Sequence, residues 1–176
     1  ELLQMLQNSI FAGAVLGLIG GFVGIFVMMR YHAFAVHGVS EMSFAGAALA
    51  LLLGYDVVTG SMVGSIASAL LIAFLGSKAS NSNSVIGALM PFGLGLGILF
   101  LSLYQGRSAN KFGLLTGQIV SVDADQLHTM IIGAVVIISL LVMVWRPLSF
   151  SSLDPEVARA KGVPMRFLSL VFMVIL

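Results

Sequence analysis

The stretch Tyr31–Gly54, YHAFAVHGVSEMSFAGAALALLLG, is long enough to cross a bilayer as a helix, yet it contains two histidines and a glutamate. The hydrocarbon core of a bilayer, about 30 Å thick, takes about 20 helical residues. If Arg30 marks the membrane edge, a rise of about 1.5 Å per residue puts Glu41 about 16 Å deep, near the bilayer centre. A carboxylate there costs about 3 kcal/mol on insertion scales, so this glutamate indicates a function.

The polar pair in this stretch has the spacing of a helical neighbour pair. His37 and Glu41 are four residues apart, which stacks their side chains one turn over the other, and Ser40 and Phe44 share that side. Imidazole nitrogen and carboxylate oxygen suit borderline ions such as Mn²⁺, Zn²⁺ and Fe²⁺, but two ligands do not complete a coordination shell. We expect other helices to supply the remaining ligands. A proton relay and a structural hydrogen-bonded pair are the alternative interpretations.

The composition is that of an integral membrane protein in contact with lipid. Hydrophobic residues make up 59% of the chain and charged residues 9%, and the mean hydropathy is +1.10. A net charge of +1 argues against a nucleic-acid partner, which would require a basic face. The absence of cysteine among the 176 residues excludes disulfides and thiolate metal sites within them.

The apolar runs predict an all-α polytopic membrane bundle of about six spans. Ser84 is expected to cap the fourth span, and Trp145 with Pro147 is expected to end the fifth. Small residues recur at four-residue spacing in the first spans, which predicts close helix packing. We expect the last span to be truncated and the chain to be C-terminally incomplete. The predicted spans are 10–29, 31–54, 57–75, 85–104, 127–145 and a sixth from about Leu168.

The positive charges predict an orientation with the N-terminus outside. Cytoplasmic loops are enriched in Lys and Arg. With Arg30 inside, only Arg107 and Lys111 fall on the outer side. The positive residues placed on the cytoplasmic side are Arg30, Lys78, Arg146, Arg159, Lys161 and Arg166.

The polar loop Asp154-Pro155-Glu156-Val157-Ala158-Arg159-Ala160-Lys161-Gly162-Val163-Pro164 predicts a short free-standing helix. It begins with a cap-like Asp154, has Pro155 at the first helical position and ends near Gly162. Such a helix on the cytoplasmic side could dock into a groove of another protein. An ordinary connector between spans is the alternative.

These residues resemble, in order and over essentially the whole chain, the permease subunit of bacterial ABC importers for manganese, zinc or iron. The similar parts are Arg30 closing the first span and the segments VHGVSEMSFAGAALALLLG, LLTGQIVSVDADQL and LDPEVARAKGVP. The last segment is the most specific. The Asp and His of the family's second helix fall on His37 and Glu41 with their order exchanged, and Ala45 stands where the family has a proline.

The resemblance implies one transmembrane permease domain over residues 1–176 in a bacterial plasma membrane, with a cytoplasmic coupling helix at 152–163. It implies three protein partners: an ABC ATPase, an extracytoplasmic metal-binding protein and a second permease copy. The divalent metal is cargo that passes His37 and Glu41, with Ser40 and Phe44 beside the path, and no permanent cofactor is expected. The chain lacks a G-x-x-x-x-G-K-[ST] loop, so we expect a non-enzymatic subunit. The coupling residues implied are Asp154, Pro155, Glu156, Ala158, Gly162 and Pro164.

Three other functions remain open at the level of sequence. One is an ABC permease for a metal chelate such as a siderophore or cobalamin. Another is a proton-coupled secondary carrier in which His37 and Glu41 relay protons. A third is a membrane subunit without transport activity. The same nitrogen and oxygen ligands suit Mn²⁺, Zn²⁺ and Fe²⁺, so all three ions also stay open.

Overall fold

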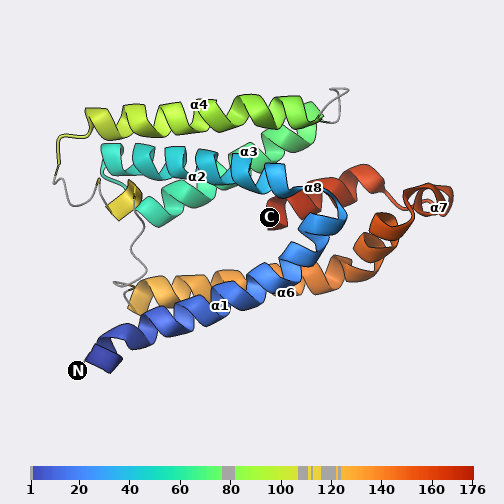
Figure 1. The fold of residues 1–176 in the computed structure, drawn as a ribbon, viewed down its shortest axis with the longest axis horizontal. Helices are drawn as coiled ribbons and strands as arrows, with labels where there is room; N and C mark the ends of the chain where they lie inside the picture. Colours follow the sequence, from blue (N-terminus) through green and yellow to red (C-terminus); the bar gives the residue numbers. More distant parts are fainter. Residues whose placement is uncertain (1, 77–81, 107–110, 112, 116–121, 123) are drawn as a thin grey trace. The chain divides into compact units, whose positions relative to one another are not determined.

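The computed structural model confirms the all-α membrane architecture (Figure 1). It describes residues 2–76, 82–106, 111, 113–115, 122 and 124–176. Within these residues, five helices are long and apolar enough to cross a membrane. They are α1 (Leu2–Met29), α2 (Ala33–Leu53), α3 (Val57–Gly76), α4 (Ser82–Leu103) and α6 (Ala124–Leu153), and the shorter helices α7 (Pro155–Ala160) and α8 (Met165–Ile175) follow.

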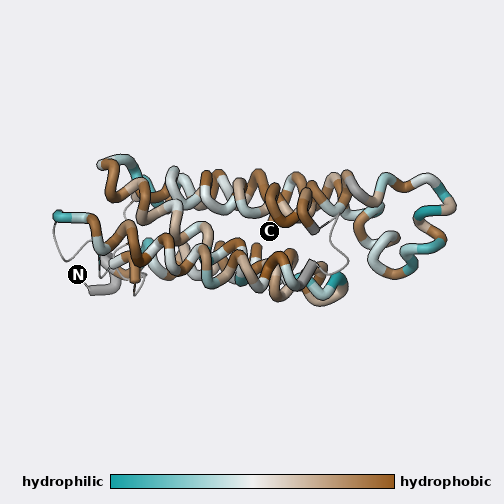
Figure 2. The backbone as a smooth tube through the Cα atoms, turned by 90° about the horizontal axis from the view of Figure 1, so that it is seen from above, coloured by the Kyte–Doolittle hydropathy of each residue, from teal (hydrophilic) through white to brown (hydrophobic). Residues whose placement is uncertain are grey.

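The chain divides by its contacts into two compact units. The first contains α1, α6 and α7, and the second contains α2, α3, α4 and residues 169–174 of α8. Hydrophobic residues follow the long helices, whereas hydrophilic residues gather in the loop that carries α7 (Figure 2). This distribution matches helices that lie in lipid and a loop that lies in water.

In the first unit, α1 and α6 lie side by side and run in the same direction (Figure 1). Near their N-terminal ends, Asn8 Nδ2 donates a hydrogen bond to the Val122 carbonyl at 3.2 Å. At their C-terminal ends, Arg30 Nε donates to Ser152 Oγ at 3.0 Å. Between these ends, Trp145 of α6 makes edge-on contacts with two rings of α1, those of Phe22 and Phe26.

The predicted end of the fifth span at Trp145 is wrong, because α6 continues to Leu153 with Pro147 inside it. A proline removes one backbone hydrogen bond, and membrane helices tolerate this loss when the surrounding structure satisfies the freed carbonyl. The helix ends instead before Asp154. Pro155 follows Asp154, and a proline disfavours the α conformation of the residue before it. The last turn of α6 therefore lies in the segment that was predicted to be loop.

In the second unit, α2 packs antiparallel against α3 through small residues. A Cβ atom added at Gly64 would lie 2.5 Å from the Met42 carbonyl oxygen, so no larger residue fits there without a shift. Gly46 contacts the backbone of Gly60 and Gly64, and Ser43 Oγ donates to the Ser61 carbonyl at 3.2 Å. Small residues of α2 thus pack against α3, in agreement with the close helix packing predicted from their spacing.

The third helix of this unit, α4, runs parallel to α2. Gly38 lies beside Ile86, and Gly93 beside the backbone of Glu41. α4 begins at Ser82, so the expected cap at Ser84 is wrong. The polar run continues into the first helical turn, where backbone N–H groups have no intrahelical partner and polar residues are tolerated. The apolar core comprises Ala35, Val39, Ala69, Ile72, Ile86 and Met173.

The turns before and after α2 use left-handed backbone conformations. Tyr31 has φ 56° and separates α1 from α2. Gly54 has φ 77°, a value that glycine adopts without a steric penalty, and the Tyr55 N–H then donates to the Ala50 carbonyl at 2.8 Å. Asp56 begins the next helix by accepting a hydrogen bond from the Thr59 N–H at 2.9 Å.

Candidate functional site

The predicted pair of His37 and Glu41 lies on α2 with its side chains directed toward each other. His37 Nε2 is 3.9 Å from Glu41 Oε1, too far for a hydrogen bond. Two ligands bound at about 2.1 Å to one tetrahedral ion would lie about 3.4 Å apart. The imidazole is 69% exposed and the carboxylate 22% exposed. A small rotation of the exposed imidazole would therefore bring both groups to one ion.

The backbone that carries Glu41 is fixed from two sides. On the α4 side, a Cβ atom at Gly93 would lie 3.0 Å from the Glu41 carbonyl carbon and from the Met42 nitrogen. On the α3 side, Gly64 packs against the Met42 carbonyl oxygen. Because both contacts are backbone against backbone, the position of the Glu41 Cα atom depends on the absence of side chains at these glycines.

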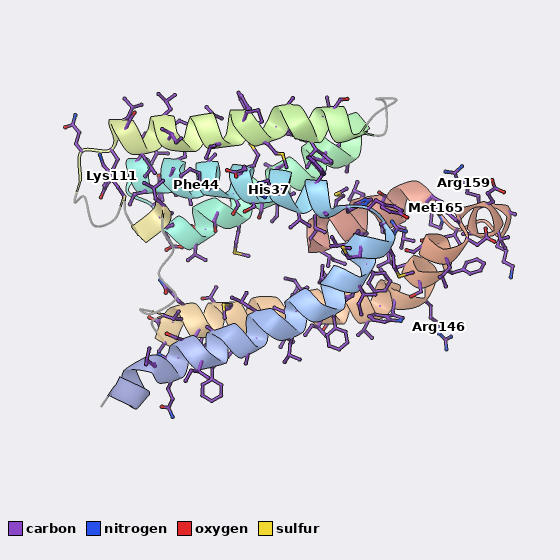
Figure 3. All side chains as sticks on the ribbon, in the orientation of Figure 1. His37, Phe44, Lys111, Arg146, Arg159 and Met165 are labelled. Carbon is purple, nitrogen blue, oxygen red and sulfur yellow. The ribbon has the colours of Figure 1, made fainter. Side chains whose placement is uncertain are left out.

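The two weaker pathway residues have different surroundings. Ser40 is exposed on α2, next to Glu41 in sequence. The Phe44 ring is half-buried and lies against Gly97 of α4. Figure 3 shows His37 and Phe44 at separate positions along α2. Phe44 therefore contributes to the contact between α2 and α4.

Further metal ligands were expected from other helices. Across the part of the chain that the structure describes, no group of three or more His, Cys, Asp or Glu side chains is placed to hold a metal ion. Within this part, His37 and Glu41 are thus a pair of candidate ligands to which no third side chain of these types is added. Two ligands bind an ion weakly, because solvent or further groups must complete its shell.

The loop predicted to contain a short free-standing helix does contain a helix, α7. The Asp154 side chain accepts a hydrogen bond from the Val157 N–H at 3.0 Å, Pro155 occupies the first turn, and Gly162 has φ 78° after the helix. Each feature matches its expected role in a short capped helix. The sequence therefore specified both ends of α7.

The implied coupling residues divide into an exposed set and one buried residue. Ala158 is fully buried, so its methyl group packs inside the protein and is not available to a partner. Two apolar side chains near the helix are exposed, Leu153 at 75% and Val157 at 41%. The coupling residues on the exposed surface are Asp154, Pro155, Glu156, Gly162 and Pro164.

Sequence reasoning missed the residues that support the site. Gly93 and Gly97 of α4, four residues apart, lie against Glu41 and Phe44 of α2. Arg30 was assigned only to the membrane edge, whereas its guanidinium donates to two serines of α6. Half of the predicted similar segment at 114–127, namely residues 116–121 and 123, lies outside the described residues.

The sequence model of the ABC 3 transport family matches residues 2–176 of this chain. The chain belongs to the ABC 3 transport family. This membership confirms the resemblance found in the sequence and, with the five apolar helices, indicates a multi-pass protein of a bacterial plasma membrane.

Individual relatives of this ABC 3 family chain show the same likeness. It is 27% identical over 174 residues to the manganese transport system membrane protein MntC of Listeria monocytogenes, covering 98% of the chain and 62% of that relative. It is 28% identical over 175 residues to the manganese import system permease protein ScaB of Streptococcus parasanguinis, covering 98% and 62%. The chain therefore spans less than two thirds of the length of these relatives.

A solved structure is similar to the ABC 3 family chain along almost all of its length. This is PsaBC from Streptococcus pneumoniae in complex with Fab, with a TM-score of 0.80 and 26% sequence identity. The match covers 98% of the chain and 65% of the solved chain. The fold found here is thus shared with an experimentally determined structure.

Proposed function

We propose that this chain is the membrane subunit of an ATP-driven importer for a divalent transition-metal ion, with Mn²⁺ as the first candidate cargo. The observation that carries the proposal is the pair of His37 and Glu41, 3.9 Å apart on a membrane-spanning helix. Family membership and relatives described as manganese transport proteins support it. Zn²⁺ and Fe²⁺ suit the same two ligands and are the other candidate ions.

In this proposal the ion passes His37 and Glu41 in a partly hydrated state. The ligating forms are neutral imidazole and ionised carboxylate, because a proton on either group competes with the metal. Two ligands bind the ion only briefly, which favours passage over storage. Ser40 lies at the exposed side of the pair, and Phe44 fixes α2 against α4 one turn further along.

The docking helix connects the membrane subunit to its energy source. We assign residues 1–176 to one permease domain and residues 152–163 to the coupling helix, which rests on a separate ABC ATPase. The segment 153–161 exposes the apolar side chains of Leu153 and Val157 and the cations Arg159 and Lys161. This surface suits an apolar groove with an acidic rim.

The complete transporter in this proposal has two further components. A second copy of the permease encloses the path, and an extracytoplasmic protein delivers the metal. ATP binding brings the coupling helices together, and the spans tilt so that the site opens to the other side. The chain itself supplies no ATP-hydrolysing group in this scheme.

Reconstitution with radioactive metal tests the proposal. The permease is assembled with its ATPase in proteoliposomes, and uptake of ⁵⁴Mn²⁺ is followed with and without ATP, with a proton gradient, and with an excess of Zn²⁺, Fe²⁺ or a metal chelate. We expect uptake that requires ATP and is unaffected by collapse of the proton gradient. Uptake driven by the gradient alone would identify a secondary carrier, and competition only by a metal chelate would identify a chelate permease.

A further inference from the structure

Arg30 connects the end of α1 to the end of α6. Its backbone N–H donates to the Phe26 carbonyl at 3.0 Å, which keeps Arg30 on the last turn of α1. Its guanidinium donates from Nε to Ser152 Oγ at 3.0 Å and from Nη2 to Ser151 Oγ. Ser151 is buried, so this contact lies within the helix pair.

The two serine oxygens are oriented to accept from Arg30. Each hydroxyl donates its proton to the Leu148 carbonyl, at 3.0 Å from Ser151 and at 2.6 Å from Ser152. The lone pairs of both oxygens then remain for the planar guanidinium, whose donors are fixed in a fork. Burial lowers the pKa of Arg30 from its ordinary value, but an arginine in a protein stays protonated. The contact is therefore charge-assisted.

The docking helix is attached to the same end of α6. The Asp154 N–H donates to the Phe150 carbonyl at 3.1 Å, so the residue that caps α7 is still bonded to α6. The Lys161 ammonium, after α7, lies 5.3 Å from the centre of the Phe150 ring. The residue before α7 is thus hydrogen-bonded to α6, and the residue after α7 makes a cation–ring contact with α6. Because both ends of α7 contact α6, a displacement of α7 moves the end of α6.

Arg30 also directly precedes the segment that leads to His37 and Glu41. Tyr31, the next residue, has φ 56°, and α2 begins at Ala33. His37 and Glu41 follow on that helix. Only two residues separate Arg30 from the helix that carries both candidate ligands, so a movement of Arg30 reaches the start of α2 directly through the backbone.

We propose that Arg30 is a positioning residue that transmits displacement of α7 to the corner between α1 and α2. The route is from α7 to the last turn of α6, through Ser151 and Ser152 to Arg30, and then along the backbone to α2. This inference rests on the proposed function, which supplies the force at α7 and the ion at α2. Arg30 thereby has a role beyond a positive charge at the membrane edge.

The first test measures metal transported per ATP hydrolysed in the assembled transporter. Arg30→Lys keeps the charge that sets topology but loses the fork, and the double substitution Ser151→Ala/Ser152→Ala removes the acceptors. We expect each to lower transport per ATP about fivefold or more while assembly and ATP hydrolysis persist. Combining them should cause no further loss, because both changes break the same contact.

Two matched controls accompany these variants. Arg146→Lys makes the same substitution at an exposed arginine of α6, whose side chain points away from the helix pair (Figure 3). Ser139→Ala removes a hydroxyl from an exposed serine of the same helix. Both should transport as the unsubstituted protein does. Unchanged transport per ATP in Arg30→Lys or in the double serine variant would overturn the proposal.

A second measurement does not depend on transport. The 176 residues contain no cysteine, so spin labels at Met28→Cys and Glu156→Cys, both exposed, report the distance from α1 to α7. We expect a narrow distribution that broadens in Arg30→Lys and in the double serine variant. Equally wide distance distributions in the unsubstituted protein and in these variants would refute the role of the Arg30 contact, even if metal uptake is driven by ATP. Absence of ATP-driven uptake in the unsubstituted protein, with broadening in the variants, would refute the proposed function and leave Arg30 as a structural tie only.

Discussion

Glu41 supplies a candidate metal ligand through its side chain and a helix contact through its backbone. Its carboxylate is 22% exposed and directed toward His37, whereas its backbone lies against a glycine of α4. A metal ligand must be held within a fraction of an ångström to keep its geometry. The glycine therefore matters to the site although it offers no ligand.

Substitution of Gly93 by alanine should impair metal uptake without removing a polar group. The new Cβ atom would lie 3.0 Å from the Glu41 carbonyl carbon, tighter than ordinary contact, so α2 or α4 must shift. A displacement of about 1 Å at a reacting or binding group can cost up to about 100-fold in rate. The measurement is the initial rate of ⁵⁴Mn²⁺ uptake in proteoliposomes.

Gly95→Ala is the matched control for that substitution. Gly95 lies on the same helix, two residues away, and an added Cβ atom there would meet nothing within 4 Å. We expect uptake at the unsubstituted rate. If both alanine variants transport equally well, the contact between Gly93 and Glu41 does not position the site.

At the level of elements, α7 depends on its cap because it has only six residues. An isolated helix of this length is unstable in water, since nucleation costs more than a few hydrogen bonds return. The Asp154 side chain accepts a hydrogen bond from the Val157 N–H, and Ala158 is fully buried. Removal of the cap should therefore loosen the docking surface as a whole.

The pair Asp154→Ala and Asp154→Asn tests this dependence. Asparagine caps helices about as well as aspartate, whereas alanine loses about 1 kcal/mol of helix stability. We expect Asp154→Ala to retain less ATPase on copurification and Asp154→Asn to retain the normal amount. The measured quantity is the molar ratio of ATPase to permease after purification. An equal loss in both variants would mean that the charge of Asp154, and not its cap, determines docking.

Local sequence signals explain which elements were predicted well. α3 was expected at 57–75 and is observed at Val57–Gly76, because Asp56 begins it and a polar run follows it. His37 and Glu41 were paired correctly, because one helical turn relates them. The prediction for α6 was wrong because it took Pro147 as the end of the helix. A membrane helix can continue through a single proline when the surrounding structure satisfies the freed backbone groups, and α6 continues to Leu153.

Contacts between distant segments could not be predicted in the same way. Arg30 and Ser151 are 121 residues apart in sequence, and no periodicity relates them. The placement of Gly93 against Glu41 depends on the register between α2 and α4, which the spacing of glycines within one helix leaves undetermined. Sequence thus specified the pairing of His37 with Glu41 and the short helix α7, but not the residues that position them.

For the molecule as a whole, the parallel direction of α1 and α6 supports the predicted topology. Among the described residues, three candidate spans lie between them in sequence, so spans that cross in alternate directions return α6 to the direction of α1. The ends marked by Arg30 and Ser152 are in contact, which places Arg30 at the same end as the docking helix. This arrangement agrees with the positive charges, which predict an external N-terminus.

Single-cysteine labelling tests this topology. With no native cysteine in the 176 residues, Tyr55→Cys and Glu156→Cys each give one reactive site in them, and both positions are exposed. We expect an impermeant maleimide to label position 55 from outside intact cells and position 156 only in inverted vesicles. Labelling of both positions from the same side would contradict the alternation of spans.

The most direct test of the central claim is metal uptake by the Glu41→Gln variant of the assembled transporter, with ATP hydrolysis measured in the same vesicles. Glutamine keeps the size of the side chain and removes its charge, and His128→Ala, at an exposed histidine of α6, serves as the control. We predict that ⁵⁴Mn²⁺ uptake is lost while assembly and ATP hydrolysis persist. Uptake at the unsubstituted rate would contradict the account, because the ion would then pass without this carboxylate.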